Sequence, residues 1–139
     1  MLDFSGLNWL AILAVTVMGF VLGGLYYSPL LFANAWLKEL GKKPEDLQAK
    51  GAEAAFPFVV AFVTALVAAV VIGALVRSVG ATSFGSGAAL GLACGVGFSA
   101  ASTFSDLAFC RFSMKLAAIQ SGYRVTYTVL MGAILAVWR

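Results

Sequence analysis

Four long apolar stretches alternate with short polar segments along the chain. They run over about residues 9–27, 54–76, 85–105 and 116–138. Each is close to the ~20 residues that an α-helix needs to cross a hydrocarbon layer of ~30 Å. The pattern therefore predicts an all-α protein, a bundle of four transmembrane helices, with residues 1–139 forming a single integral membrane domain.

A different pattern follows the first stretch, where apolar and polar residues alternate at helical spacing between Pro29 and Gly41. Ser28 and Pro29 suit an N-cap and a first helical turn, and Gly41 suits a helix end. We expect an amphipathic helix lying in the headgroup region between the first and second spans, with Trp36 as its interface anchor. An irregular polar loop is the alternative.

Composition and charge agree with a membrane protein and suggest its orientation. Hydrophobic residues make up 62% of the chain and charged residues 11%, against roughly 45–50% and 25% in soluble domains. Basic residues gather in the two longer loops, as Lys38, Lys42, Lys43, Lys50, Arg111 and Lys115, and only Arg77 and Arg139 lie on the opposite side. This bias predicts cytoplasmic longer loops and both termini outside.

Residues that could catalyse a reaction or bind a metal or a nucleotide are scarce. Histidine is absent, no carboxylate lies in the middle of an apolar stretch, and no nucleotide-binding or metal-ligand motif is present. We therefore expect no enzymatic activity, no cofactor and no bound metal. The net charge of +3 sits in short loops and does not indicate a nucleic-acid partner.

Small residues recur every four positions in the third stretch and more briefly in the first. The members of these two stripes are Gly87, Gly91, Gly95, Ser99 and Thr103, and Gly19 and Gly23. In a bilayer, close backbone approach across small residues drives helix association. We expect the first and third spans to meet through these stripes. Alternatively, the stripe of the third span faces another subunit.

Polar residues near one membrane face form a candidate site, consisting of Tyr27, Ser28, Asp106, Tyr123 and Arg124. Because an intramembrane charge is costly, Arg124 is predicted to contact Asp106 or to reach headgroups beside Tyr123. A structural role is the simpler interpretation, and a substrate or ion site is the alternative. Tyrosines at such positions most often form an interface belt.

Several segments resemble the domain of unknown function 1761 family of small four-helix integral membrane proteins. They are Gly23–Phe32 with Trp36, Phe109–Arg111 through Lys115, Gly122–Tyr123, and Met131–Leu135 with Trp138. Relatives often have tryptophan in place of Tyr26 and an acid near Gln120. The resemblance implies the same architecture and carries no established activity.

Two functions from different classes are consistent with these patterns. The first is a non-catalytic structural or accessory subunit that packs through small-residue faces in a homo-oligomer or a larger membrane complex. The second is a small oligomeric transporter, or a membrane protein that binds a lipid or small molecule, with a polar pocket on the cytoplasmic side. The expected partners are the lipid bilayer and other membrane-protein subunits, and the expected location is a bacterial cytoplasmic membrane.

Overall fold

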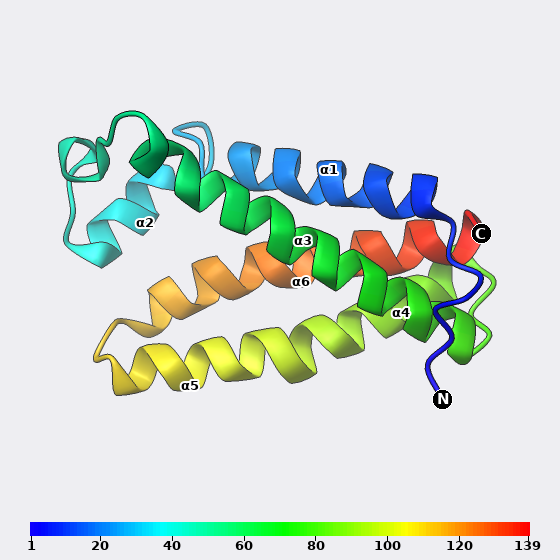
Figure 1. The fold of residues 1–139 in the computed structure, drawn as a ribbon. Coiled ribbons are helices and arrows are strands. Elements are labelled where there is room, and N and C mark those ends of the chain that lie inside the picture. The colour runs from blue at the N-terminus through cyan, green and yellow to red at the C-terminus, as the bar shows by residue number, and fades with distance from the viewer.

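The computed structural model describes residues 1–139, which form helices and no strands. The elements are α1 (Trp9–Tyr26), α2 (Ala33–Leu40), the 3₁₀ turn η1 (Pro44–Leu47), α3 (Ala52–Ser78), α4 (Phe84–Cys94), the π-helical segment η2 (Gly95–Ala100), α5 (Ala101–Phe109) and α6 (Met114–Val137). Since α4, η2 and α5 follow one another without a break, they make one long helix. Each of the four apolar stretches thus corresponds to one long helix (Figure 1).

Three of the long helices are long and apolar enough to cross a membrane, which fits a membrane protein. They are α1, α3 and the continuous helix Phe84–Phe109, with mean hydropathies of 2.0, 2.9 and 1.4. The fourth long helix, α6, has 24 residues but is more polar around Gln120 and Arg124. It packs against α1, α3, α4, η2 and α5, so much of its surface meets protein.

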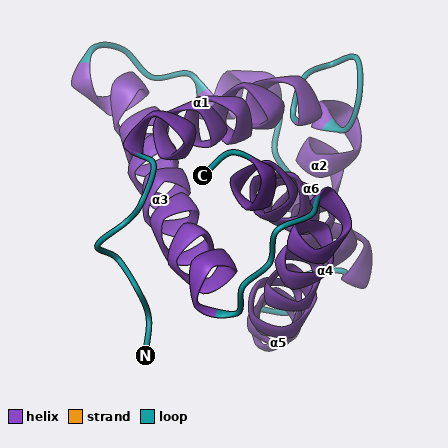
Figure 2. Ribbon diagram, turned by 90° about the vertical axis from the view of Figure 1, so that its right-hand side faces the viewer, coloured by secondary structure: helices purple, strands orange, loops and turns teal.

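The long helices reverse direction at each connection, so the molecule has two distinct ends (Figure 1). Both termini lie at one end, and α2, η1 and the α5–α6 turn lie at the other. Figure 2 shows α1 and α3 on one side of α6, with α4 and α5 on the other. The basic loops therefore share one end of the molecule.

The end with the termini, which we call the closed half, contains the hydrophobic core. Its largest fully buried side chains include Ile12, Val76 and Met131 from three different helices. Helix α3 presents the small residues Ala65, Ala69 and Gly73 to this core. A Cβ added at Gly73 would lie 2.9 Å from Ile12 Cδ1, so the side chain of α1 already occupies that space. Small residues thus let α3 approach closely here.

The small-residue stripes of the first and third spans both face α6, and the prediction that these two spans meet through them is wrong. A Cβ at Gly91 would overlap the backbone of α6 at Thr128, and one at Gly87 would overlap Gly132. A Cβ at Gly19 would lie 3.0 Å from Met131 Cε, also on α6. Because Gly132 is itself small, α4 can approach α6 most closely at this position. Helix α6 thus lies between the first and third spans, which were expected to meet each other.

The π-helical segment η2 keeps the second half of the long stripe on the same face. Four residues of an α-helix turn through about 400°, so a four-residue repeat drifts about 40° per step. A π turn holds more residues than an α turn and reverses this drift. Gly95 and Thr103 are consequently both buried on the α6 side, and Thr103 is only 5% exposed.

Helix α2 exists as predicted from the sequence but begins later. The expected N-cap, Ser28, donates its hydroxyl proton to the carbonyl of Leu25 and caps nothing. Residues 28–32 instead form turns, in which the Phe32 N–H donates to the Tyr26 carbonyl at 3.1 Å. The chain needs these turns to reverse direction directly after α1. Gly41 ends α2 in the left-handed conformation, with φ of 70°, as expected.

Candidate functional site

A cleft of about 700 Å³ opens at the end of the molecule that carries α2, which we call the open half. Helices α3 and α5 diverge toward this end, as Figure 1 shows. The cleft lies between α1, α2, α3 and α6, and its lining consists of Phe20, Gly23, Gly24, Tyr27, Trp36, Pro57, Phe58, Ala61, Gln120, Tyr123 and Arg124. Phe58 and Arg124 are exposed, so the cleft is accessible from outside.

Phenylalanines form the apolar wall of the cleft. The Phe20 ring meets Phe58 and Phe62 edge-on, with centroids 6.3 Å and 6.0 Å apart. In the open half, these rings occupy the space between α1 and α3. In the closed half, the small residues Ala65 and Ala69 take this place, and the space between the helices is narrow. No residue of α3 before Ala65 is buried. The change from small to bulky residues along α3 thus separates the helices where the cleft begins.

The other wall is polar and comes mainly from α6. Gln120, Tyr123 and Arg124 lie at the spacing that places side chains on one helix face. Arg124 is the only charged residue of the lining. Its Nη1 donates to the Thr103 hydroxyl at 3.3 Å. It forms no ion pair within 4.0 Å, so the predicted contact with Asp106 is wrong: Asp106 lies beyond Thr103 on α5 and is exposed.

Two reciprocal tyrosine–glycine contacts fix α1 against α6 beside the cleft. The Tyr123 hydroxyl donates to the Gly19 carbonyl at 2.8 Å, and the Tyr26 hydroxyl donates to the Ile119 carbonyl at 2.7 Å. Each ring needs a glycine on the facing helix. A Cβ at Gly23 would lie 2.8 Å from the Tyr123 oxygen, and one at Gly122 would lie 2.6 Å from the Tyr26 oxygen.

These tyrosines belong to a continuous aromatic cluster between α1, α2 and α6. Tyr123 contacts Tyr26, Tyr27 and Tyr127, with centroids 5.0–5.7 Å apart. Tyr26 also stacks on Phe32, with centroids 4.5 Å apart. Such aromatic pairs add to the stability of helix packing beyond the area that they bury. Tyr27 and Tyr123 of this cluster line the polar end of the cleft.

Trp36 joins α2 to this cluster. Its ring packs on Tyr27 with centroids 5.3 Å apart, and its side chain lines the cleft. The indole N–H is buried and has no hydrogen-bond partner in the protein. Trp36 therefore lines the cleft, and its role as an anchor in the headgroup region stays a prediction.

Helix α2 is attached to the start of α6 through Glu39. The Glu39 carboxylate accepts a hydrogen bond from the hydroxyl of Ser113, the N-cap of α6, and lies 3.8 Å from Lys115 Nζ. An anionic side chain at the N-terminus of a helix is favourable because the helix dipole is positive there. This contact holds Trp36 over the cleft.

The structure brings together three of the five residues expected at the polar site. Tyr27, Tyr123 and Arg124 line the cleft, whereas Ser28 and Asp106 do not. The sequence interpretation missed the apolar wall and Gln120. A signal for Gln120 was present, because it precedes Arg124 by four residues and so shares its helix face. The apolar wall had no signal, since phenylalanine is ordinary in a membrane span.

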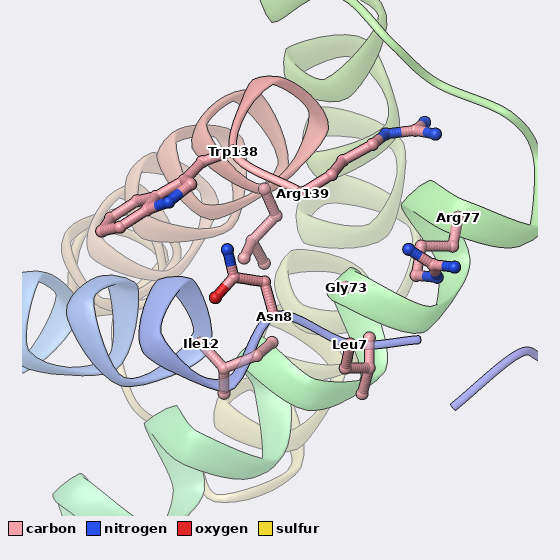
Figure 3. A pocket seen from close by; sticks show the side chains of 8 residues that line it. Leu7, Asn8, Ile12, Gly73, Arg77, Trp138 and Arg139 are labelled. Carbon is pink, nitrogen blue, oxygen red and sulfur yellow. The ribbon is translucent and has the colours of Figure 1, made fainter. Parts of the chain in front are cut away.

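A second pocket lies in the closed half, and it is far smaller. Its volume is about 10 Å³, enough for about one water molecule. Figure 3 shows Leu7 and Asn8 from the segment that leads into α1, Gly73 and Arg77 from α3, and Trp138 from the chain end. This pocket has no room for a larger ligand.

The helices and the cleft fit a small helical membrane protein. Residues 10–136 match the family described as Protein of unknown function (DUF1761), and the chain belongs to this family. No curated protein and no solved structure matches the chain. The family has no assigned function, so the cleft itself is the basis for a functional proposal.

Proposed function

We propose that all four long helices cross a bacterial cytoplasmic membrane as one bundle, with α2 at the interface and the basic loops in the cytoplasm. Helix α6 is the most polar of the four, but its neighbours on both sides are other helices and shield it from lipid. The open half then faces the cytoplasm. A reporter fused after Arg139 tests this orientation, and cytoplasmic reporter activity would contradict it.

Within this architecture, we propose that the protein binds an amphipathic, lipid-like molecule in the cleft and has no catalytic chemistry. The supporting observation is the division of the cleft into a phenylalanine wall and a polar end. Its volume of about 700 Å³ falls in the range of about 300–1,000 Å³ that is usual for ligand pockets. An apolar tail would contact the phenylalanines, and the head would meet the polar side chains.

A substitution that fills the cleft without disturbing the fold tests this proposal. A Cβ at Gly24 would meet no atom within 4 Å, so Gly24→Leu projects into free space beside the cleft. We expect this variant to fold normally and to lose lipids that co-purify with the parent protein, as measured by native mass spectrometry. Unchanged lipid binding in a folded Gly24→Leu protein would refute binding in the cleft.

A second candidate function is that of an accessory subunit that self-associates or packs against another membrane protein. The specific observation is a further stripe of exposed small residues on the outer face of the third span: Gly85, Ala89, Ala93, Gly97 and Ala101. The stripe expected from the sequence packs against α6, so it is not free for another subunit. The outer stripe has the spacing that favours close helix approach.

The two candidates can be separated by a crossed pair of variants. Gly97, like Gly24, has no atom within 4 Å of an added Cβ. If subunits pack through the outer stripe, Gly97→Leu reduces the oligomeric mass in detergent and leaves lipid binding intact. If the cleft alone carries function, Gly24→Leu abolishes lipid binding and Gly97→Leu changes neither property. Each variant is the control for the other.

A further inference from the structure

The charge of the cleft is unbalanced. Arg124 lies ten residues after Met114, about 15 Å along α6, and therefore well inside the proposed membrane span. A guanidinium has five N–H donors, and only one recorded hydrogen bond of Arg124 satisfies any of them. Charges inside a membrane are usually paired, and no carboxylate lines this cleft.

Trp36 of α2 lines the same cleft. The buried indole N–H of Trp36 has no partner in the protein. Since the indole nitrogen has almost no accessible surface, it is not a donor for a ligand in the cleft. Arg124 is therefore the charged donor that a ligand head in the cleft would meet, with Trp36 in the same lining.

We infer that the cleft selects an amphiphile with an anionic head, a phosphate-bearing lipid, whose oxygens accept from Arg124. This inference rests on the proposed function and adds the class of ligand. A lipid is favoured over a free anion because phenylalanines form the wall beside the polar end. Arginine pairs with phosphate through two parallel hydrogen bonds, which strengthens the selection.

The indole signal of Trp36 provides a local readout. The chain has three tryptophans, and Trp9 and Trp138 lie at the opposite end, so their indole N–H resonances serve as internal controls. The protein in a neutral detergent is titrated with phosphatidylglycerol or with phosphatidylcholine of the same acyl chains, and a Trp36→Phe variant assigns the signal. We expect phosphatidylglycerol to shift the Trp36 resonance at a concentration at least about tenfold lower than phosphatidylcholine does.

Variants then separate the head group from the cleft. Arg124→Gln should remove the tenfold preference, and Arg124→Lys, which keeps the charge, should retain part of it. Lys42→Gln, which removes an exposed cation of the loop after α2, should leave it unchanged. If Arg124→Gln fails to fold, Arg124→Lys provides the test. A partial loss of the preference for phosphatidylglycerol in Arg124→Lys then supports the inference, and an unchanged preference overturns it.

Different failures have different meanings. If both lipids bind equally and Gly24→Leu blocks both, the cleft binds amphiphiles and the inference about the anionic head is overturned. If Gly24→Leu changes no binding, the proposed function itself is wrong. If inorganic phosphate shifts Trp36 as effectively as phosphatidylglycerol, the ligand is a free anion, and the assignment to a lipid falls.

Discussion

The two halves of the molecule are built from the same helices, yet one is closed and the other is open. In the closed half, Ala65, Ala69 and Gly73 of α3 pack against α1 and α6, and the pocket there measures about 10 Å³. In the open half, Phe58 and Phe62 of the same helix meet Phe20, and the cleft measures about 700 Å³. Side-chain size along one helix thus decides where a membrane protein has room for a ligand.

The contrast extends to the way in which the helices are held together. Packing in the closed half relies on small and branched apolar residues in close contact. Beside the cleft, tyrosine hydroxyls and ring contacts hold α1 to α6, while Glu39 attaches α2. Close packing suits a stable scaffold, whereas a few polar contacts allow a site to stay accessible. Substitutions in each half test this division.

The largest effect is expected where backbones touch, at Gly91. Gly91→Ala places a Cβ against the backbone of Thr128, which cannot move aside as a side chain could. Overpacking of this kind costs about 1–3 kcal/mol, and we expect a loss at the upper end of that range in thermal unfolding in detergent. Gly85→Ala on the same helix is the control, because its Cβ meets no atom within 4 Å. Equal stability of both variants would show that α4 does not pack on α6 as described.

A smaller effect is expected beside the cleft, at Tyr123. Tyr123→Phe removes the hydrogen bond to the Gly19 carbonyl and keeps the ring contacts. Hydrogen bonds between membrane helices are worth about 0.6 kcal/mol on average and at most about 1.7. Thermal unfolding should therefore show a loss of about 1 kcal/mol. Tyr127→Phe leaves this bond in place, and a loss as large as that of Tyr123→Phe would contradict the assignment.

A local effect is expected at α2. Glu39→Ala removes both the hydrogen bond from Ser113 and the contact with Lys115. Partly exposed ion pairs contribute less than about 1 kcal/mol, so global stability should hardly change. Hydrogen exchange of the α2 amides should become faster by up to about fivefold, because the helix opens more often. Glu45→Ala in η1 is the control, and unchanged exchange in α2 would show that Glu39 does not attach it.

The smallest effect is expected at the chain start, at Asp3. Hydrogen bonds from the hydroxyl and the backbone N–H of Ser5, at 2.7 Å and 3.0 Å, lower the pKa of Asp3, and Arg77 lowers it further. Since the folded pKa is depressed, this contribution is present at neutral pH and is lost as the pH falls through the folded pKa. Ser5→Ala should raise the pKa of Asp3 in an NMR titration. Ser102→Ala, far away on α5, should not.

Part of the candidate site was visible in the sequence, and part was not. Tyr27 and Tyr123 lie near the same predicted membrane face as Arg124, and Arg124 stands out because a charged residue in an apolar stretch is costly. Asp106 stands out for the same reason, yet it is exposed and unpaired with Arg124. Whether two polar residues on different helices meet depends on the rotation of each helix about its axis, which hydropathy does not report.

Hydropathy predicts where the long helices run, and the conformational freedom of Gly41 predicts where α2 ends, because both act locally. In contrast, the position of α6 in the middle, with both small-residue stripes facing it, depends on how the helices pack in three dimensions. A face of small residues can pack against any helix with a complementary surface, so the spacing of its residues does not predict which helix it contacts. The cleft arises in the same way, from the fit of residues far apart in the chain, such as Phe20, Phe58 and Arg124.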